Sequence, residues 1–310
     1  MRALHGAGRT AVGLDIKPSP FTTFVGSIAD RAFVHECLQG VRAVIHTATL
    51  HKPHLATHSL QEFIDTNVTG TLNLLTEAVD ARVGSFVFTS TTSAFGRALT
   101  PKAGIPAAWI TEDVAPVPKN IYGITKVAAE NLCELFHRDF GLTCLILRTS
   151  RFFPEPDDNV ETRLAYSDAN SKVNELLFRR VDIEDVVSAH LLALEKAESI
   201  EFGRYIISAT TPFTLNDLSE LRTDARAVVK RLVPGYEDIY ARLGWSMFPT
   251  LDRVYVNDRA RRELGWAPRY DFALALAQLA AGQDYRSPLA SVIGSKGYHS
   301  QVFADGPYPV

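Results

Sequence analysis

Short apolar runs alternate with amphipathic stretches of helical period along most of this chain, and that alternation limits the fold more than any other feature. The apolar runs that suit buried strands cover residues 41–48, 85–96, 142–150 and 203–209. Apolar side chains recur at steps of three and four over residues 30–40, 60–81, 122–140 and 183–197. A proline-rich stretch at 98–118 is predicted to be a surface loop. Apolar strands separated by helices predict an α/β fold with a doubly wound parallel sheet.

The composition fits such a core and narrows the class of partner. The chain has 310 residues, of which 46% are apolar, and these can fill a sizeable core. Its formal net charge of -3 comes from interspersed charges, which argues against a nucleic-acid or membrane surface. No apolar run is long enough to span a bilayer, and the N-terminus lacks the pattern of a signal peptide. Cys37, Cys133 and Cys144 are widely spaced in apolar segments, which is typical of reduced core thiols and predicts a cytoplasmic location.

A glycine pair near the start has the spacing G-x-G-x-x-A of a dinucleotide-binding turn, with Gly6 and Gly8 followed by Ala11. Such a turn follows a strand and opens a helix, and an acidic residue comes about 20 positions later. Here residues 2–5 are typical of the end of a helix, and residues 11–15 form a short apolar strand that ends in an acid. Gly6 and Gly8 are therefore predicted to terminate a helix.

Asp15 closes that short strand, at the edge where open α/β sheets bind their ligands. A carboxylate there can accept both hydroxyls of an adenosine ribose and would repel a 2′-phosphate, so it favours NAD over NADP. Lys17 weakens this preference. A surface turn before Pro18 is the alternative interpretation.

Tyr122 and Lys126 lie four residues apart at the start of a predicted helix, so their side chains share one face. A free phenol has a pKa of about 10, and an adjacent ammonium together with a cationic nicotinamide would stabilise the phenolate. Tyr122 could then take the proton of a substrate hydroxyl while hydride leaves for the cofactor. Hydroxyl residues at 89–93 end a buried strand at the same edge, where one could bond the reacting oxygen. Chance spacing of the pair and turn-capping hydroxyls are the alternatives.

Eight segments in a fixed order make the chain resemble the extended short-chain dehydrogenases/reductases of the NAD-dependent epimerase/dehydratase type. They span most of the chain and read VGLD, VIHTAT, NVTGTLNLLTEA, FVFTSTTSAFG, YGITKVAAE, LILRTS, VDIEDVVSAHLLALE and RARRELGW. The resemblance implies a Rossmann-type sheet. It also makes Thr91 the catalytic Ser/Thr, Tyr122 the proton-transferring tyrosine and Lys126 the lysine that holds the nicotinamide ribose. The further cofactor contacts that it implies are Asp15 at the adenosine ribose, Ile28 at the adenine, Thr47, Ala48, Thr49 and Leu50 along the cofactor, Asn67 at its middle, and Ser150 at the nicotinamide amide.

The chain departs from that family at its start. Family members begin with a strand and a G-x-x-G-x-x-G turn that holds the pyrophosphate. Here Met1 stands inside the helix that should follow the turn. The first strand and glycine-rich turn are therefore expected about 20 residues upstream of the printed sequence.

Two further departures bear on the reaction and the substrate. Thr92 and Ser93 stand where the family's sugar 4,6-dehydratases carry Asp-Glu, so water elimination is not expected. The stretch between Pro154 and Val181 lacks the G-x-G-x-x-R-x-F signature for a nucleotide-sugar diphosphate.

Thr91, Thr92 and Arg151 are expected to contact the substrate. The Arg151 guanidinium stands where relatives place an asparagine, and it could clamp a carboxylate or a phosphate. An ion pair of Arg151 with Glu155 or Asp157 is the alternative.

Two polar clusters suggest other sites that the sequence does not favour. Four histidines within residues 46–58 lack a carboxylate pattern such as H-E-x-x-H, so we expect no metal and predict loop histidines beside the cofactor. Asp182, Glu184 and Asp185 resemble paired glycosidase carboxylates, but at the head of an apolar helix they complement its dipole.

Residues 1–150 together with 181–210 are expected to form the NAD-binding domain, residues 151–180 and 211–285 a substrate-binding part, and residues 286–310 a tail. The sequence predicts an NAD-dependent oxidoreductase or epimerase that acts through Thr, Tyr and Lys on a hydroxyl of a sugar, sugar acid or nucleotide sugar. An NADPH-dependent carbonyl reductase and a non-catalytic cofactor sensor are the alternatives. A small-molecule substrate is expected as partner, without nucleic acid or membrane, and the resemblance allows a homodimer.

Overall fold

The computed structural model describes residues 1–294 and 303. The chain folds as two compact units. The first unit comprises residues 1–94, 118–147 and 190–204, and the second comprises residues 95–117, 148–189 and 205–310. These boundaries differ from the expected domain ranges, which place residues 95–117, 148–150, 181–189 and 205–210 in the NAD-binding domain. What each part binds stays a prediction.

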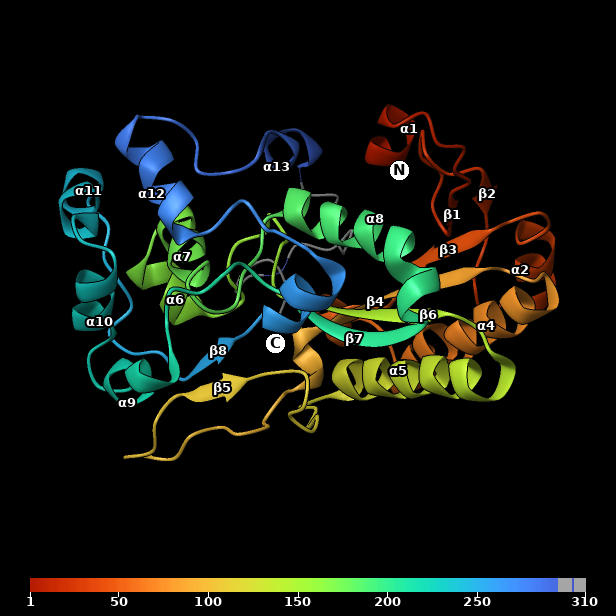
Figure 1. The fold of residues 1–310 in the computed structure, drawn as a ribbon, viewed down its shortest axis with the longest axis horizontal. Coiled ribbons are helices and arrows are strands. Elements are labelled where there is room, and N and C mark those ends of the chain that lie inside the picture. The colour runs from red at the N-terminus through yellow and green to blue at the C-terminus, as the bar shows by residue number, and fades with distance from the viewer. Residues whose placement is uncertain (295–302, 304–310) are drawn as a thin grey trace. The chain divides into compact units, whose positions relative to one another are not determined.

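A four-stranded sheet in the order β3-β4-β6-β7 contains the apolar runs of the sequence (Figure 1). Its strands are Ala43–His46 (β3), Ser85–Thr91 (β4), Cys144–Thr149 (β6) and Phe202–Ile207 (β7). β3 and β4 pair in parallel, with Val44 beside Phe86 and His46 beside Phe88. The predicted α/β class with a parallel sheet is confirmed.

A second, two-stranded parallel sheet precedes the first in sequence. It consists of β1 (Leu14–Asp15) and β2 (Phe24–Val25). Before it, α1 (Arg2–Gly6) ends in the glycine segment, and Gly8 has a φ of 65°. Gly6 is the last residue of the helix and Gly8 follows it, so the two glycines end a helix, as predicted, and do not open one. After β2, α2 (Arg31–Cys37) begins at Asp30, whose side chain accepts a hydrogen bond from the Phe33 amide.

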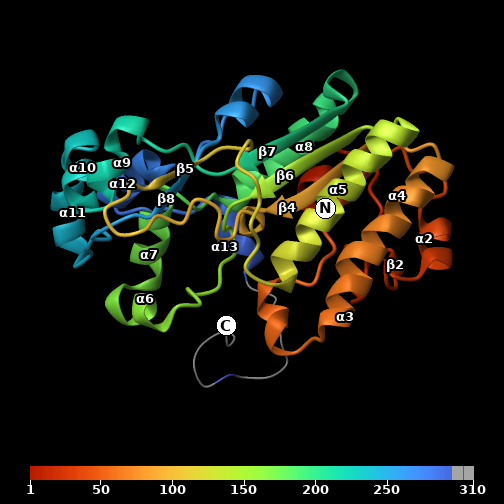
Figure 2. The same ribbon diagram turned by 90° about the horizontal axis from the view of Figure 1, so that it is seen from below.

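Two long helices cover one face of the four-stranded sheet. α4 (Gly70–Asp80) and α5 (Ile121–Phe140) run side by side there (Figure 2), and the part of α8 (Ile183–Ile200) from residue 190 onward lies along the other face (Figure 1). α5 begins at Asn120, whose side chain accepts from the Gly123 amide, and ends at Gly141 with a φ of 69°. Leu74, Leu75 and Ala78 of α4 and Ala129, Cys133 and Phe136 of α5 belong to one apolar core with Phe86 and Phe88 of β4. Each large apolar side chain buried in this way contributes about 1.5–3 kcal/mol.

The helix predicted over residues 60–81 contains an irregular turn. It consists of α3 (Leu60–Phe63), a π-helical segment η2 (Ile64–Thr69) and α4. π-Helical turns occur mostly at functional sites. Asn67, one of the expected cofactor contacts, lies in η2.

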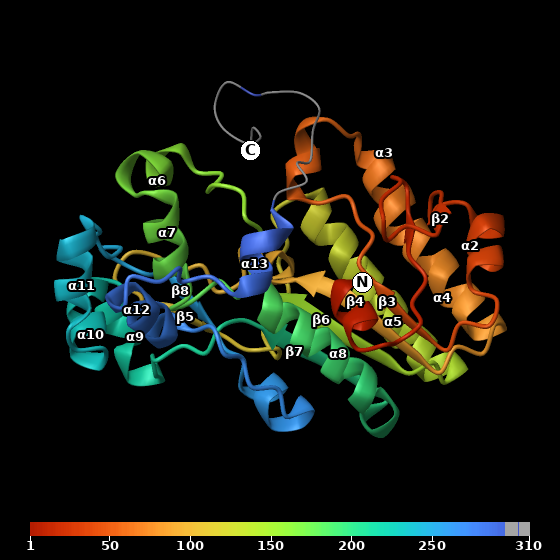
Figure 3. The ribbon, with the colours of Figure 1, turned by 90° about the horizontal axis from the view of Figure 1, so that it is seen from above.

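The second unit gathers short helices around a two-stranded parallel sheet of β5 (Ala108–Ile110) and β8 (Arg253–Tyr255), as Figure 3 shows. The helices are α6 (Val160–Ala165), α7 (Asp168–Glu175), α9 (Leu218–Leu221), α10 (Ala225–Leu232), α11 (Tyr236–Leu243), α12 (Phe272–Ala280) and α13 (Pro288–Ile293). Their core includes Val173, Leu177, Val228, Val229 and Phe272. Short helical turns complete both units, at η1 (Lys52–Ala56), η3 (Thr92–Ala94), η4 (Leu215–Asp217) and η5 (Ala260–Leu264).

Two parts of the second unit differ from the sequence-based expectation. β5 lies in the proline-rich stretch 98–118, for which the sequence predicts a loop. Among the described strands it pairs only with β8, which comes far later in the chain. No local sequence pattern therefore predicts β5. α13 occupies part of the expected tail 286–310, and the rest of that tail, apart from residue 303, lies outside the described residues. No helix in the described chain is long and apolar enough to cross a bilayer.

Candidate active site

The N-terminal turns of α5 carry two of the three residues expected to be catalytic. Tyr122 and Lys126 lie one turn apart, and both side chains are buried, with 3% and 2% of their surface exposed. The third, Thr91, ends β4 and is also buried. All three belong to the first unit.

The Thr91 hydroxyl lies close enough to the Tyr122 phenol to act on its pKa. Burial raises the pKa of Tyr122 well above its ordinary value, and the Thr91 hydrogen bond acts in the opposite direction. The Thr91 hydroxyl oxygen also accepts a hydrogen bond from the Ser93 amide, at 3.0 Å. Thr91 is thereby fixed on both sides, by the turn that follows β4 and by the phenol of α5.

Lys126 is held by β4 and not by the phenol. Its ammonium donates to the main-chain carbonyl oxygen of Thr89 at 2.7 Å and lies 4.0 Å from the centre of the Phe88 ring. Burial lowers the pKa of Lys126 to about 7, while the Glu130 carboxylate and the Cys133 thiol act to raise it. The sequence predicts that Lys126 lowers the pKa of Tyr122. In the protein alone the opposing group is Thr91, and burial dominates.

Asn67 fixes the segment that follows β3. Its side-chain oxygen accepts from the Leu50 amide at 2.7 Å and from the Thr49 hydroxyl at 3.0 Å. Its side-chain nitrogen donates to the Leu50 carbonyl and to the Thr125 hydroxyl, both at 3.0 Å. Asn67 therefore holds the backbone of the expected stretch Thr47 to Leu50 and ties it to α5.

The ring of His51 lies against Tyr122, with 4.8 Å between the ring centroids. The His51 amide donates to Nδ1 of His54 at 2.7 Å, which fixes the start of η1. The loop histidines thus include one that contacts a residue of the site. Within the described residues, no group of three or more His, Cys, Asp or Glu side chains is placed to hold a metal ion.

Asp15 and Ile28 differ in exposure. The Asp15 carboxylate is exposed at the end of β1, where it accepts the Lys17 amide at 2.9 Å. Ile28 is buried against α4, and a Cβ on Gly70 would lie 2.5 Å from its side chain. Asn73 holds the same turn by donating to the Ile28 carbonyl at 3.0 Å.

These residues fit an NAD molecule in their donor chemistry. Asp15 offers a carboxylate to ribose hydroxyls, and the segment held by Asn67 offers fixed backbone. Lys126 offers a buried cation beside a buried phenol.

Ser150 and Arg151 lie in the second unit. The Ser150 hydroxyl is buried and has no hydrogen-bond partner in the part of the chain that is described. The Arg151 guanidinium donates to Asp157 at 2.5 Å, to Asp158 at 2.8 Å and to Glu175 at 2.9 Å. The Arg151 guanidinium is therefore part of an internal ion-pair network. The network includes Asp157, one of the two ion-pair partners that the sequence analysis gives as the alternative for Arg151.

The carboxylates at the start of α8 also have structural partners within the second unit. Asp185 accepts the amides of Arg269 and Tyr270, each at 2.9 Å. Asp182 accepts the amides of Glu184 at 2.8 Å and of Ser287 at 3.1 Å. They secure chain segments at the helix start, as expected of carboxylates that complement its dipole.

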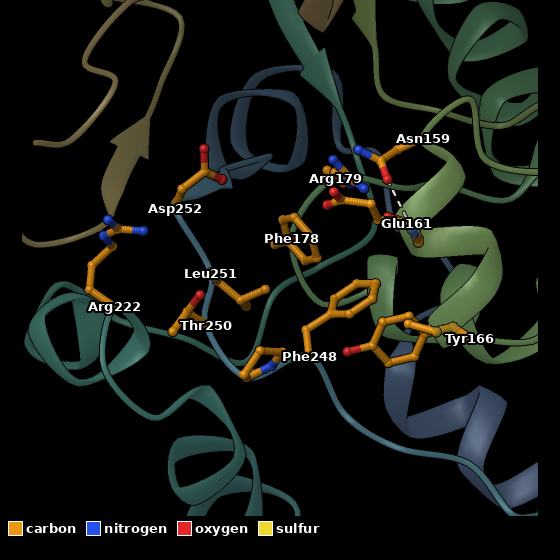
Figure 4. A pocket seen from close by; sticks show the side chains of 13 residues that line it. Asn159, Glu161, Tyr166, Phe178, Arg179, Arg222, Phe248, Thr250, Leu251 and Asp252 are labelled. Carbon is orange, nitrogen blue, oxygen red and sulfur yellow. Dashed lines mark hydrogen bonds between the residues drawn. The ribbon is translucent and has the colours of Figure 1, made fainter. Parts of the chain in front are cut away.

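A pocket of about 410 Å³ lies within the second unit (Figure 4). Its aromatic side is formed by Tyr166, Phe178 and Phe248, with 4.8 Å between the ring centroids of Tyr166 and Phe248. Arg179 and Arg222 also line it. Nε of Arg222 is buried and lacks a hydrogen-bond partner among the described residues.

Sequence reasoning missed Glu130, which is 1% exposed on α5. Its carboxylate accepts a hydrogen bond from the Ser90 hydroxyl at 2.5 Å. The available signal was spacing, since Tyr122, Lys126 and Glu130 follow one another at four-residue steps.

The chain is similar to known proteins in sequence and in fold. Residues 1–208 match the family model described as the NAD dependent epimerase/dehydratase family. A UDP-glucose 4-epimerase of Rhizobium leguminosarum bv. trifolii is 26% identical over 283 residues, covering 80% of each chain. A dTDP-glucose 4,6-dehydratase of Streptomyces antibioticus is 30% identical over 285 residues, covering 85% of this chain and 77% of the relative.

Solved structures show the same fold. A short-chain dehydrogenase/reductase superfamily protein from Agrobacterium tumefaciens with bound NAD has a TM-score of 0.62 at 22% identity, and 90% of this chain and 91% of that chain are covered. The UDP-glucose 4-epimerase of Thermotoga maritima has a TM-score of 0.58 at 22% identity, with 91% and 94% covered. The fold, the enzyme class and NAD as its cofactor, all predicted from the sequence, are confirmed. With its parallel sheet, its buried Tyr and Lys on α5 and a family match over two thirds of its length, the chain belongs to the NAD-dependent epimerase/dehydratase family.

Proposed function

We propose that this protein oxidises a hydroxyl group of a nucleotide sugar with NAD and that its net reaction is epimerisation. The observation that carries the proposal is the grouping of the Thr91 hydroxyl at the end of β4 with the buried Tyr122 and Lys126 on the first turns of α5. An alcohol that enters this site meets a hydroxyl, a phenol and a fixed cation together. That set can move one proton and stabilise the change of charge on one oxygen.

Tyr122 is the proposed proton carrier. Burial keeps its phenol protonated in the protein alone, so it can donate to a carbonyl oxygen. In the oxidising direction the phenol would first release its own proton to solvent, which positive charge nearby favours, and the phenolate oxygen of Tyr122 would then take the proton of the substrate hydroxyl. When bound, NAD accepts hydride from the carbon that bears this hydroxyl, and it can return the hydride.

Thr91 and Lys126 have supporting roles in the proposal. The Thr91 hydroxyl bonds the reacting oxygen and opposes the effect of burial on the phenol. Lys126 supplies a fixed positive charge to the cofactor ribose and to the phenol. Asp15 and the segment that Asn67 holds would contact the rest of the cofactor.

Epimerisation is favoured over dehydration by the residues after Thr91. Elimination of water needs an acid and a base beside the tyrosine, and the side chains that follow Thr91 are the hydroxyls of Thr92 and Ser93. The relatives include both a UDP-glucose 4-epimerase and a dTDP-glucose 4,6-dehydratase.

The pocket of the second unit is proposed as a binding site for a nucleotide. Phe248 and Tyr166 offer rings on which a base can stack, and Arg222 offers a buried N–H to a phosphate or carbonyl oxygen. Its lining residues fall within the ranges 151–180 and 211–285 that the sequence assigns to substrate binding. Thr92, Ser150 and Arg151, together with a homodimer and a cytoplasmic location, stay predictions.

The test is turnover of nucleotide sugars with NAD. The protein is incubated with UDP-glucose, UDP-N-acetylglucosamine, UDP-glucuronic acid or dTDP-glucose, and proton NMR follows the sugar while absorbance follows NADH. A new stereoisomer without accumulating NADH is the expected result. NADH formed in proportion to product would make the enzyme a dehydrogenase, and NAD binding without any conversion would favour the cofactor-sensor alternative.

A further inference from the structure

Three successive residues of β4 each interact with a residue of α5, and the three α5 residues lie one helical turn apart. The pairs are Thr91 with Tyr122, Thr89 with Lys126, and Ser90 with Glu130. The first two pairs belong to the proposed site. The third is equally buried, since Ser90 is 2% and Glu130 1% exposed, and no role in the reaction has been given to it above.

The environment of Glu130 suits a carboxylate. Oε1 accepts from the Ser90 hydroxyl at 2.5 Å, and Oε2 lies 3.6 Å from Nε of Arg204 on β7. Arg204 also donates to Glu134 at 2.7 Å, at the outer end of the same helix face. A buried carboxylate is costly unless it is hydrogen-bonded and near a cation, and Glu130 has both kinds of partner.

The titratable groups linked to Lys126 and to its neighbours lie on α5, β6 and β3. Burial alone lowers the pKa of Lys126, and the opposing groups on α5 are the Glu130 carboxylate and the Cys133 thiol. On β6, the thiol of Cys144 interacts with Cys133 through a hydrogen bond and not a disulfide. Burial raises the pKa of Cys133, which keeps its thiol neutral. On β3, burial lowers the pKa of His46 to about 3, so His46 is neutral as well. Glu130 is therefore the charged group that opposes the cost of burying the ammonium.

We propose that Glu130 is a positioning residue of the site, which keeps Lys126 in its ammonium form and fixes the register of β4 against α5 through Ser90. The inference rests on the proposed function for its meaning in catalysis, but its electrostatic part is a property of the protein alone. Removal of the charge should leave the fold intact and still lower the fraction of Lys126 that is charged.

The first experiment measures Lys126 directly in protein without cofactor. Lysine labelled with ¹³C at Cε is titrated by NMR, and the Lys126 signal is identified by its loss in Lys126→Arg. Glu130→Gln should lower the Lys126 pKa by about one unit or more, because the Glu130 carboxylate, one helical turn away on α5, acts to raise that pKa. Glu134→Gln is the matched control, since it removes a carboxylate from the same helix and from the same arginine, and it should leave the value unchanged.

The second experiment uses the reaction. A fall of about one unit in the Lys126 pKa lowers the ammonium fraction at pH 8 about tenfold and has little effect well below pH 6. The alkaline limb of kcat should therefore move to lower pH in Glu130→Gln, with KM for the sugar nearly unchanged. If the protein turns over no nucleotide sugar, the proposed function fails while the NMR titration still decides the role of Glu130.

An unchanged Lys126 pKa in folded Glu130→Gln overturns the proposal and leaves Glu130 as a packing residue. If Glu130→Gln does not fold, the Lys126 pKa is measured in Glu130→Asp instead. Withdrawing the carboxylate by one methylene breaks the bond to Ser90 and weakens the attraction, so the Lys126 pKa must fall below that of the wild type. A value equal to those of the wild type and Glu134→Gln rejects the proposal as well.

Discussion

The ammonium of Lys126 donates to the main-chain carbonyl oxygen of Thr89 at 2.7 Å. A hydrogen bond from a charged donor contributes about 1.5–3 kcal/mol, so the lysine does not leave this position without cost. Thr89 lies two residues before Thr91 on the same strand, and Lys126 lies one turn after Tyr122. The strand and the helix therefore hold the cation, the phenol and the hydroxyl as one rigid group.

Replacement of Tyr122 by Phe should abolish most turnover and leave NAD binding nearly intact. The variant loses the only atom that can carry the substrate proton, and such groups contribute about 10²–10⁴-fold to rate. Steady-state kinetics and calorimetric titration with NAD measure the two effects. Retained turnover would show that the phenol is not the proton carrier.

Thr91→Val should lower kcat about 10²-fold, as expected when a hydrogen bond to a reacting oxygen is lost. Without the Thr91 hydroxyl, the effect of burial on the pKa of Tyr122 is unopposed, so the phenol also becomes a weaker acid. Thr91→Ser keeps the hydroxyl and is the matched control, with kcat close to that of the wild type. Equal losses in both variants would point to packing and not to the hydroxyl.

Asn67→Ala should weaken NAD binding about tenfold. The change removes the bonds that hold the Leu50 amide and carbonyl, so the segment must be ordered when the cofactor binds. Asn170→Ala is the control in the second unit, because the Asn170 side chain bridges the backbone of Ser246 in a similar way. Both variants should lose stability, and only Asn67→Ala should lose NAD affinity in a fluorescence titration.

Glu175→Gln should destabilise the protein by about 3–5 kcal/mol, because it leaves the buried Arg180 and the half-buried Arg151 and Arg179 without their shared partner. Glu175 is 1% exposed and accepts from Arg151 at 2.9 Å, from Arg179 at 2.8 Å and from Arg180 at 2.8 Å. Burial raises its pKa, but these arginines outweigh burial and hold the pKa of Glu175 well below its ordinary value.

The ion pairs of Glu175 with the three arginines make the free energy of unfolding depend on pH in the acid range. Because the folded-state pKa of Glu175 is lowered, the stabilisation is fully present above the ordinary glutamate pKa of about 4.3 and is lost as the pH falls below it. Urea unfolding at several pH values between neutral and acid should show a steep loss for the wild type and a flatter one for Glu175→Gln. Parallel curves would mean that Glu175 does not contribute to acid sensitivity.

Local pattern was enough to predict the strands and helices that build the sheet. The apolar run before Thr91 became β4, and the periodic stretch after Asn120 became α5. These elements form because burial of their own apolar side chains decides their conformation. β5 has no such pattern, and only its pairing with β8 makes it a strand.

The sequence by itself determined which residue types stand at the end of β4 and along one face of α5, because strand and helix periods fix spacing and side. Only the tertiary structure decided which atoms meet. The Lys126 ammonium donates to the Thr89 carbonyl oxygen, and the Arg151 guanidinium forms ion pairs with three carboxylates. Glu130 became a buried partner of Ser90. Such pairings depend on burial and on distances between elements far apart in the chain, and neither quantity is encoded in a local pattern.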